Sequence, residues 1–178
     1  MNILRPLLFG LLLTALFAAS PRRAVCSGRG QDQGLHQNDQ NERQSANATL
    51  TSDHPAASFA IPPETLKSAP PIVVIQVTKV ANPGKTPFQI FVYLSYRSAP
   101  EQKQMEKILI GNVGLFPADR PAGFLLRASS AFELLKATAP GAIDVCVLVE
   151  LKPLYESDKL TSVEVTVAPP KWKAAPGN

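Results

Sequence analysis

The chain has 178 residues, of which 45% are hydrophobic and 18% charged, and a net charge of +4. Three of its 18 basic residues, Arg5, Arg22 and Arg23, lie in or beside the N-terminal segment, which leaves 15 Lys and Arg against 14 Asp and Glu from Ser27 onward. Because this nearly neutral part shows no basic stripe, the sequence gives no support to a surface that binds nucleic acid or an anionic membrane.

Residues 1–26 have the composition of a secretory signal peptide. Arg5 precedes an apolar run of about 13 residues from Leu7 to Ala19, whereas a helix that crosses a bilayer needs about 20. A positive charge, a short apolar core and then small residues are typical of an export signal. We therefore predict a secreted or periplasmic protein with no membrane span after cleavage. An uncleaved N-terminal membrane anchor is the alternative.

The cleavage point of this segment stays open, and with it the fate of Cys26. Cleavage after Ser20 follows suitable small residues but places Pro21 directly after the cut, which is unfavourable. A cut next to Cys26 also fits. Lipidation of Cys26 is a further alternative. A bacterial lipoprotein signal needs a Leu-like residue three before the cysteine and a small residue directly before it, and Arg23 and Val25 stand there.

Two further segments are predicted to lie outside the folded domain. Residues 27–69 are rich in Gly, Gln, Asn, Asp and Ser and poor in apolar residues, so they cannot bury enough surface to offset the entropy lost on ordering. We predict a disordered polar linker there. Residues 169–178 begin with two prolines, which cannot continue a central strand. We predict a flexible tail, from which Trp172 can still fold back onto the domain.

From Ile72 onward the sequence alternates between apolar and polar residues, which predicts β-strands. Gly111 and Gly114 interrupt one of these strands and indicate a bulge or a close backbone contact. Ser130 and Glu133 fit a capping box, which predicts one short helix. The expected strands are 72–80, 88–96, 108–116, 124–128, 143–151 and 163–167.

These elements predict one folded domain over residues 70–168. Their order shows no βαβ rhythm and no repeat of fixed period, and turn signals recur about every ten residues. The predicted fold class is therefore all-β, an antiparallel β-sandwich of about six strands with one short helix.

The chemistry that this domain offers is sparse. The chain has two histidines, His36 and His54, and both lie in the predicted linker. Neither a blue-copper site nor a Ser–His or Cys–His pair can therefore form in the core. Four carboxylates could in principle work as acid–base pairs, but their positions fit solvated charges better: Asp119, Asp144, Glu150 and Glu164. We predict no catalytic residue, no metal, no other cofactor and no enzyme activity.

Two features of the predicted strands have two interpretations each. Cys146 lies on the polar side of its strand, where it is either a half-buried small residue or, after export, the disulfide partner of Cys26. Phe91 and Tyr93 lie on the face opposite the core residues of their strand. They are either covered, as in a central strand, or form an exposed aromatic patch for a partner.

The order of the strands and the helix resembles a known domain. Its segments are Phe88-Gln89-Ile90-Phe91-Val92-Tyr93-Leu94, Ile110-Gly111-Asn112-Val113-Gly114-Leu115-Phe116, Phe124-Leu125-Leu126, Phe132-Glu133-Leu134-Leu135, 145–153 and Val163-Glu164-Val165. Residues 71–168 resemble the C-terminal domain of tyrosinases and plant polyphenol oxidases, including its bacterial relatives. The family's Lys-Phe-Asp-Val signature is replaced here by Pro87-Phe88-Gln89-Ile90, and its late Val-Pro-Arg pattern by Glu150-Leu151-Lys152-Pro153.

The resemblance implies a partner rather than an activity. In that family the domain lies over the entrance to the copper site and holds the enzyme latent with a plug residue, and separate helper proteins accompany some bacterial tyrosinases. The family's catalytic domain holds two coppers with six histidines, and this chain has two histidines. The resemblance therefore implies a shield or maturation partner that acts in trans on a di-copper oxidase. Phe116, Tyr96 and Met105 are the candidate plug residues.

The sequence thus predicts a non-catalytic exported β-sandwich that binds a protein partner, with a tyrosinase-like copper oxidase as the candidate. Phe91 and Tyr93 join the candidate plug residues as predicted partner contacts. A structural or surface-tethered module for the envelope or for adhesion is the first alternative. A hydrolase that uses carboxylates is the second, with Asp144, Glu150 and Glu164 as its candidates.

Overall fold

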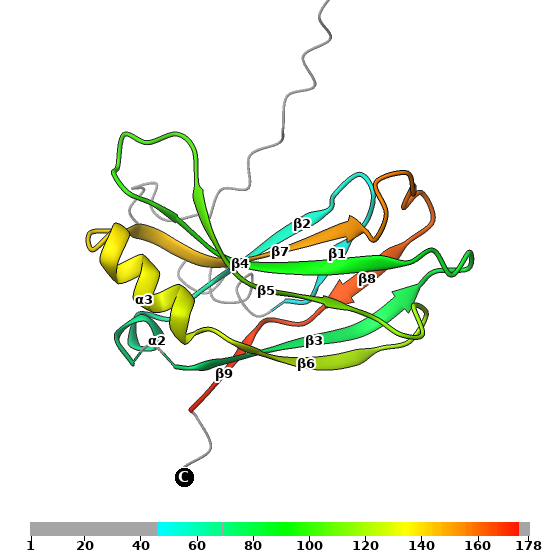
Figure 1. The fold of residues 1–178 in the computed structure, drawn as a ribbon, viewed down its shortest axis with the longest axis horizontal. Coiled ribbons are helices and arrows are strands. Elements are labelled where there is room, and N and C mark those ends of the chain that lie inside the picture. The colour runs from blue at the N-terminus through cyan, green and yellow to red at the C-terminus, as the bar shows by residue number, and fades with distance from the viewer. Residues whose placement is uncertain (1–45, 69, 175–178) are drawn as a thin grey trace, which may run out of the picture.

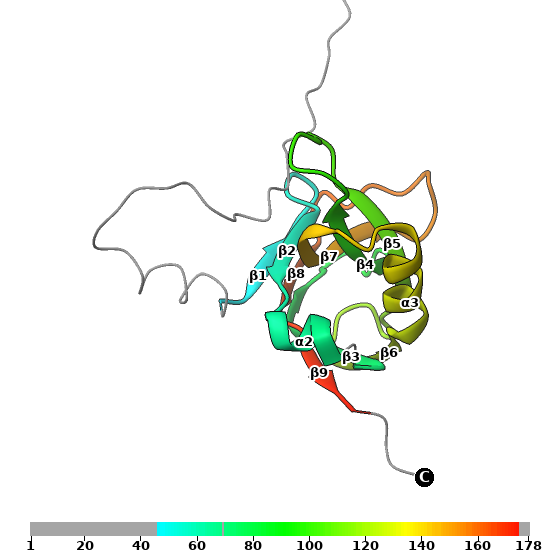
Figure 2. The same cartoon turned by 90° about the vertical axis from the view of Figure 1, so that its left-hand side faces the viewer.

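The computed structural model describes residues 46–68 and 70–174. The predicted signal peptide, Cys26, His36 and residues 27–45 and 69 of the predicted linker lie outside these residues. The described chain forms two antiparallel sheets that face each other, with two helices at one end (Figures 1 and 2). The prediction of an all-β fold with a short helix is confirmed. No helix of the described part is long and apolar enough to span a membrane.

The first sheet has the strand order β1-β8-β3-β6, and β9 also pairs with β3. All of its pairings are antiparallel. β8 and β9 pair with successive parts of β3, since Ala81 lies opposite Glu164 while Val73 lies opposite Trp172. The strands are β1 (Ala48–Leu50), β3 (Ile72–Ala81), β6 (Ala122–Arg127), β8 (Glu164–Val167) and β9 (Lys171–Lys173).

The second sheet has the strand order β2-β7-β4-β5 and is also antiparallel. β4 is a central strand, flanked by β7 and β5. The register with β5 shifts between Val92 and Tyr93, next to Gly111, which is the bulge that the glycine pattern predicts. The strands are β2 (Ala56–Ala60), β4 (Phe88–Arg97), β5 (Glu106–Gly114) and β7 (Ile143–Pro153).

The core lies between the two sheets and follows from the alternation of the strands. In β4, Ile90, Val92 and Leu94 are fully buried, and in β7 Val147 and Val149 are at most 1% exposed. Full burial of one such side chain stabilises the fold by roughly 1.5–3 kcal/mol. Because successive side chains of a strand point to opposite faces, the residues between these point away from the core.

The two helices are α2 (Pro63–Ser68) and α3 (Ser129–Thr138). α3 buries Phe132 and Leu135 against the core. The predicted capping box is wrong, because the N-cap of α3 is Ala128, two residues before Ser130, and no side chain caps the helix. Ala128 is fully buried and its amide donates to the carbonyl of Pro71, at 2.7 Å. The pairing of the preceding strand therefore sets where the helix starts.

The boundaries of the folded domain are wider than predicted. Residues 48–68, predicted to be linker, form β1, β2 and α2, and Leu50, Phe59 and Ile61 enter the core. The predicted flexible tail contains β9, where the ring of Trp172 lies 5.4 Å from that of Phe132. The strands of both segments, β1, β2 and β9, are short edge strands, which gain their order from pairing with distant residues rather than from their own composition.

Candidate functional site

The end of the sandwich opposite the helices is made of connections between strands, and we call this the loop end (Figure 1). These connections link β1 to β2, β3 to β4, β5 to β6, and β7 to β8. Large apolar side chains are exposed on two of them: Phe116 at 101%, Tyr155 at 60% and Leu154 at 43%. Exposed apolar residues gathered at one place are typical of interaction sites.

Phe116 is presented by an anchored backbone. Its neighbour Leu115 is 6% exposed and belongs to the core. Two residues further on, the carbonyl of Ala118 accepts a hydrogen bond from Asn82 Nδ2, at 2.9 Å. Asn82 is itself buried and also accepts from the amide of Thr86. The β5–β6 connection is therefore tied to the β3–β4 turn on one side of Phe116 and to the core on the other.

The second surface of interest is the outer face, the side of the β2-β7-β4-β5 sheet that is turned away from the core. Phe91 and Tyr93 lie on it, with ring centroids 6.2 Å apart and planes within 14° of each other. Lys152 Nζ lies over both rings, 4.8 Å from the centroid of Phe91. Lys107 Nζ lies 5.3 Å from that of Tyr93. Cation–π contacts thus link the aromatic pair to its neighbours.

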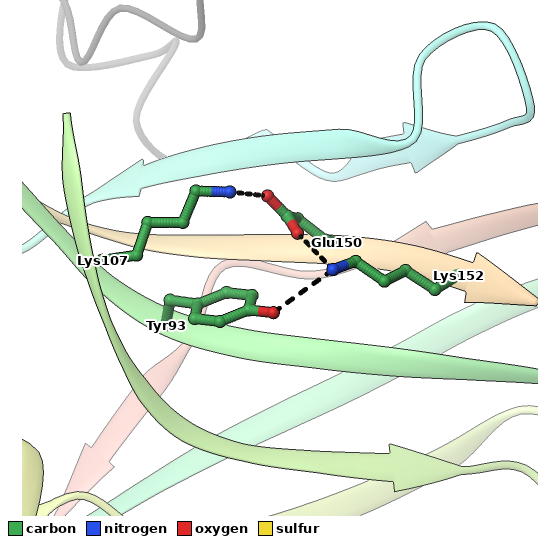
Figure 3. A network of polar contacts seen from close by, with 4 residues as sticks. All are labelled: Tyr93, Lys107, Glu150 and Lys152. Atoms are coloured by element: carbon green, nitrogen blue, oxygen red, sulfur yellow. Dashed lines mark hydrogen bonds and ion pairs between the residues drawn. The ribbon is translucent and has the colours of Figure 1, made fainter. Parts of the chain in front are cut away.

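A polar network joins these residues across three strands (Figure 3). Lys107 of β5 donates to Glu150 of β7. Lys152 Nζ lies 3.2 Å from the other carboxylate oxygen of Glu150 and donates to the hydroxyl of Tyr93, at 3.4 Å. Phe91 lies directly opposite Glu150 in the β4–β7 register. On the outer face, Lys107, Glu150 and Lys152 are therefore paired with one another beside the half-buried rings of Phe91 and Tyr93.

The charges of this network shift one another's pKa values. Partial burial raises the pKa of Glu150, but the hydrogen bonds and charges of Lys107 and Lys152 outweigh it and hold that pKa below its usual value. Partial burial likewise lowers the pKa of Lys152, and its bonds to Glu150 and Tyr93 raise it further than burial lowers it. Both groups are charged at neutral pH, which is the state that the ion pair requires.

The structure separates the five predicted contact residues. Phe116 lies at the loop end, while Phe91 and Tyr93 lie on the outer face. Tyr96 is 4% exposed, and its hydroxyl donates to Glu106 Oε2 at 3.0 Å, so its ring belongs to the core. Met105 is half-buried just before β5. Tyr96 and Met105 are at the opposite end of the β4–β5 hairpin from Phe116, because Tyr96 pairs with Glu106 and Gln89 pairs with Gly114.

The candidate carboxylates and histidines do not converge within the described residues. Asp144 pairs with Arg97, and Glu150 with two lysines, whereas Glu164 lies on the other sheet. His54 stands in the turn before β2. Across residues 46–68 and 70–174, no group of three or more His, Cys, Asp or Glu could hold a metal ion.

Cys146 is 1% exposed and disulfide-bonded. Cys26, the other cysteine of the chain, lies outside the described residues.

No protein-family model matches the chain, and a search of curated proteins finds no match. The loop end and the outer face are therefore the features of this molecule that indicate its function.

Proposed function

We propose that this protein is a non-catalytic, exported β-sandwich that binds a protein partner through its loop end, with Phe116 as the central contact. The observation that carries the proposal is the full exposure of Phe116 on a backbone that is tied down on both sides. Apolar rings are among the side chains that contribute most to protein interfaces when a partner's pocket buries them. Tyr155 and Leu154 supply further apolar surface at the same end.

The energetics favour a plugging role for Phe116. Transfer of an exposed Phe ring into an apolar pocket contributes roughly 1.5–3 kcal/mol, or about 10- to 100-fold in affinity. An anchored backbone loses little conformational entropy on binding. Most of this gain therefore remains available for the complex.

We further propose that the partner is a tyrosinase-like di-copper oxidase, which this protein shields or helps to mature. The resemblance of residues 71–168 to the tyrosinase C-terminal domain supports this choice of partner, because that domain covers a copper-site entrance with a plug residue. Phe116 ends the Ile110–Phe116 segment on which the resemblance partly depends. The mechanism is the filling of an apolar entrance by shape and contact.

The test adds the purified exported protein to a tyrosinase that lacks its own C-terminal domain and measures oxidation of a diphenol. We expect inhibition that saturates with concentration, and Phe116→Ala should raise the half-inhibitory concentration about 10- to 100-fold. Leu125→Ala is the matched control, since Leu125 is 64% exposed but lies on β6, away from the loop end. It should inhibit as the wild type does.

Two results would overturn this proposal. One is an oxidase that is unaffected by the wild-type protein, both after and during copper loading. The other is equal inhibition by the wild type and Phe116→Ala. A protein that inhibits nothing and keeps an unprocessed, membrane-bound N-terminus would favour the surface-tethered module. A neighbouring gene for a histidine-rich di-copper oxidase without a C-terminal domain would support the oxidase as partner.

A further inference from the structure

A pocket lies at the helix end of the sandwich, which is the end opposite the loop end (Figures 1 and 2). Its volume is about 440 Å³, within the range of about 300–1,000 Å³ that is typical of sites for small organic ligands. Residues of α2, of β9 and the two prolines before β3 line it: Thr65, Ser68, Pro70, Pro71, Trp172 and Lys173. The pocket is therefore separate from the surface around Phe116 that the proposed function uses.

The walls of this pocket include apolar rings that the fold holds in place. Trp172 lies opposite Val73 in the register of β9 with β3, and its ring lies 5.4 Å from that of Phe132. The carbonyl of Pro71 accepts a hydrogen bond from the amide of Ala128, at 2.7 Å, and the proline ring fixes its own φ angle. A ligand that enters the pocket therefore has to order little of the protein, which lowers the cost of binding.

The polar groups of the pocket favour a negatively charged ligand. Lys173 is the one charged residue among the described residues that line it, and Thr65 adds a hydroxyl group. Both side chains can donate hydrogen bonds. Lys67 in the last turn of α2 and Lys171 of β9 add two positive charges to these elements, against the single negative charge of Glu64. The charge of the two elements is therefore complementary to that of an anion.

We propose that this pocket binds a small carboxylate that carries an aromatic ring. The ring packs between Trp172 and the two prolines, where stacking and the burial of apolar area stabilise it. The carboxylate accepts hydrogen bonds from Lys173 and Thr65. Small-molecule sites typically combine apolar walls with a few polar groups that fix the orientation of the ligand. The ring and the carboxylate are therefore both needed for full affinity.

The single tryptophan of the chain supplies the measurement. Because Trp172 is the only Trp among the 178 residues, its fluorescence reports on this pocket. The purified full chain is titrated with phenylacetate and with two probes that each lack one feature. Phenylethanol keeps the ring and lacks the charge, whereas galacturonate keeps the charge and has a sugar ring in place of the aromatic one.

We expect phenylacetate to change the fluorescence of Trp172 saturably, with a Kd below about 1 mM. The other two probes should bind at least about fivefold more weakly. Three results would each overturn the proposal. They are the absence of saturable phenylacetate binding in both fluorescence and calorimetry, phenylethanol that binds as tightly as phenylacetate, and galacturonate that binds as tightly as phenylacetate, which would indicate a sugar site.

Two lysine variants test the role of the charge. Lys173→Gln should weaken the binding of phenylacetate about fivefold and leave that of phenylethanol unchanged, because it removes the charge but not the apolar walls. Lys171→Gln is the matched control, since Lys171 lies on the same strand and does not line the pocket. It should bind phenylacetate as the wild type does. Equal weakening in the two variants would show a diffuse attraction and refute the site.

The inference does not depend on the proposed partner. All of these measurements use the protein and a small molecule, and the oxidase enters none of them. A failure of phenylacetate to bind therefore leaves the role of Phe116 untouched, and a failure to inhibit the oxidase leaves the pocket untouched.

Discussion

The two faces of β4 and β7 differ in kind although they share the same backbone. Inward, Ile90, Val92 and Val149 are fully buried among aliphatic neighbours. Outward, Tyr93 and Glu150 are half-buried, and their contacts are ion pairs, hydrogen bonds and cation–π contacts. The inner face of this pair of strands therefore stabilises the fold, whereas its outer face presents a specific polar surface to solvent.

The physical origin of the difference is the cost of removing each group from water. Aliphatic side chains are stabilised roughly in proportion to the area that they bury. Charged groups near the surface gain little from pairing, typically about 0–1 kcal/mol, because water and salt screen them. Variants of the inner face should therefore change stability most, and variants of the outer face should change its pH dependence.

The largest effect is expected for Leu94→Ala. Leu94 is fully buried in the core, so its truncation should lower the free energy of unfolding by about 2–5 kcal/mol. Leu109→Ala is the matched control on the outer face, where Leu109 is 52% exposed, and should cost no more than about 0.5 kcal/mol. Denaturant titration measures both. Similar losses for the two variants would contradict the assignment of the two faces.

The next effect concerns the disulfide of Cys146, for which Cys26 is the predicted partner. Cys26→Ser should lower the free energy of unfolding by about 2–4 kcal/mol, because the bond would close a long loop in the unfolded chain. The wild type in a thiol reductant should fall to the level of the variant. If reductant leaves the stability of the wild type unchanged, the bond does not contribute to the folded state.

A smaller effect is expected for Glu150→Gln, and it depends on pH. Lys107 and Lys152 hold the pKa of Glu150 below its usual value in the folded state. Its contribution is therefore present above the unfolded pKa of about 4.3 and is lost as the pH falls through the folded pKa. At neutral pH the variant should be less stable by about 1 kcal/mol.

The difference between the two proteins should shrink as the pH is lowered from 7 to 3. The pKa of Glu106 is also lowered, by hydrogen bonds from Ser98, Gln102 and Tyr96. Because Glu106 is present in both the wild type and Glu150→Gln, its contribution cancels in the difference between their stabilities. Thermal unfolding over this pH range makes the measurement. A difference that is constant or grows toward acid would contradict the ion-paired state of Glu150.

The sequence was sufficient to predict the strands whose own pattern alternates. β3, β4 and β7 lie within two residues of their expected bounds. β1, β2 and β9 were missed because they are strands of three to five residues. Phe59 pairs with Val147, far along the chain. These short strands are ordered by long-range pairing, which no local sequence pattern predicts.

The candidate site was predictable only in part, for the same reason. Phe116 could be singled out because it ends an alternating segment just before Pro117. Leu154 and Tyr155 were missed, since only the topology brings the β7–β8 connection to the end where Phe116 lies. The pairing of Glu150 with Lys107 depends on the register of three strands. Tyr96 belongs to the core because the register sets its hydroxyl beside Glu106.

The smallest effect on stability is expected for Phe116→Ala, although this variant has the largest expected effect on binding. A ring that is fully exposed loses no packing when it is removed, so the free energy of unfolding should change by no more than about 0.5 kcal/mol. Its neighbour Leu115, at 6% exposure, is the matched contrast, and Leu115→Ala should cost about 2–5 kcal/mol. Denaturant titration of both variants measures these two free energies of unfolding, and so distinguishes the buried Leu115 from the exposed ring of Phe116. A loss above about 1 kcal/mol for Phe116→Ala would mean that the ring packs against its own domain, and a ring that packs there is not available to fill the pocket of a partner.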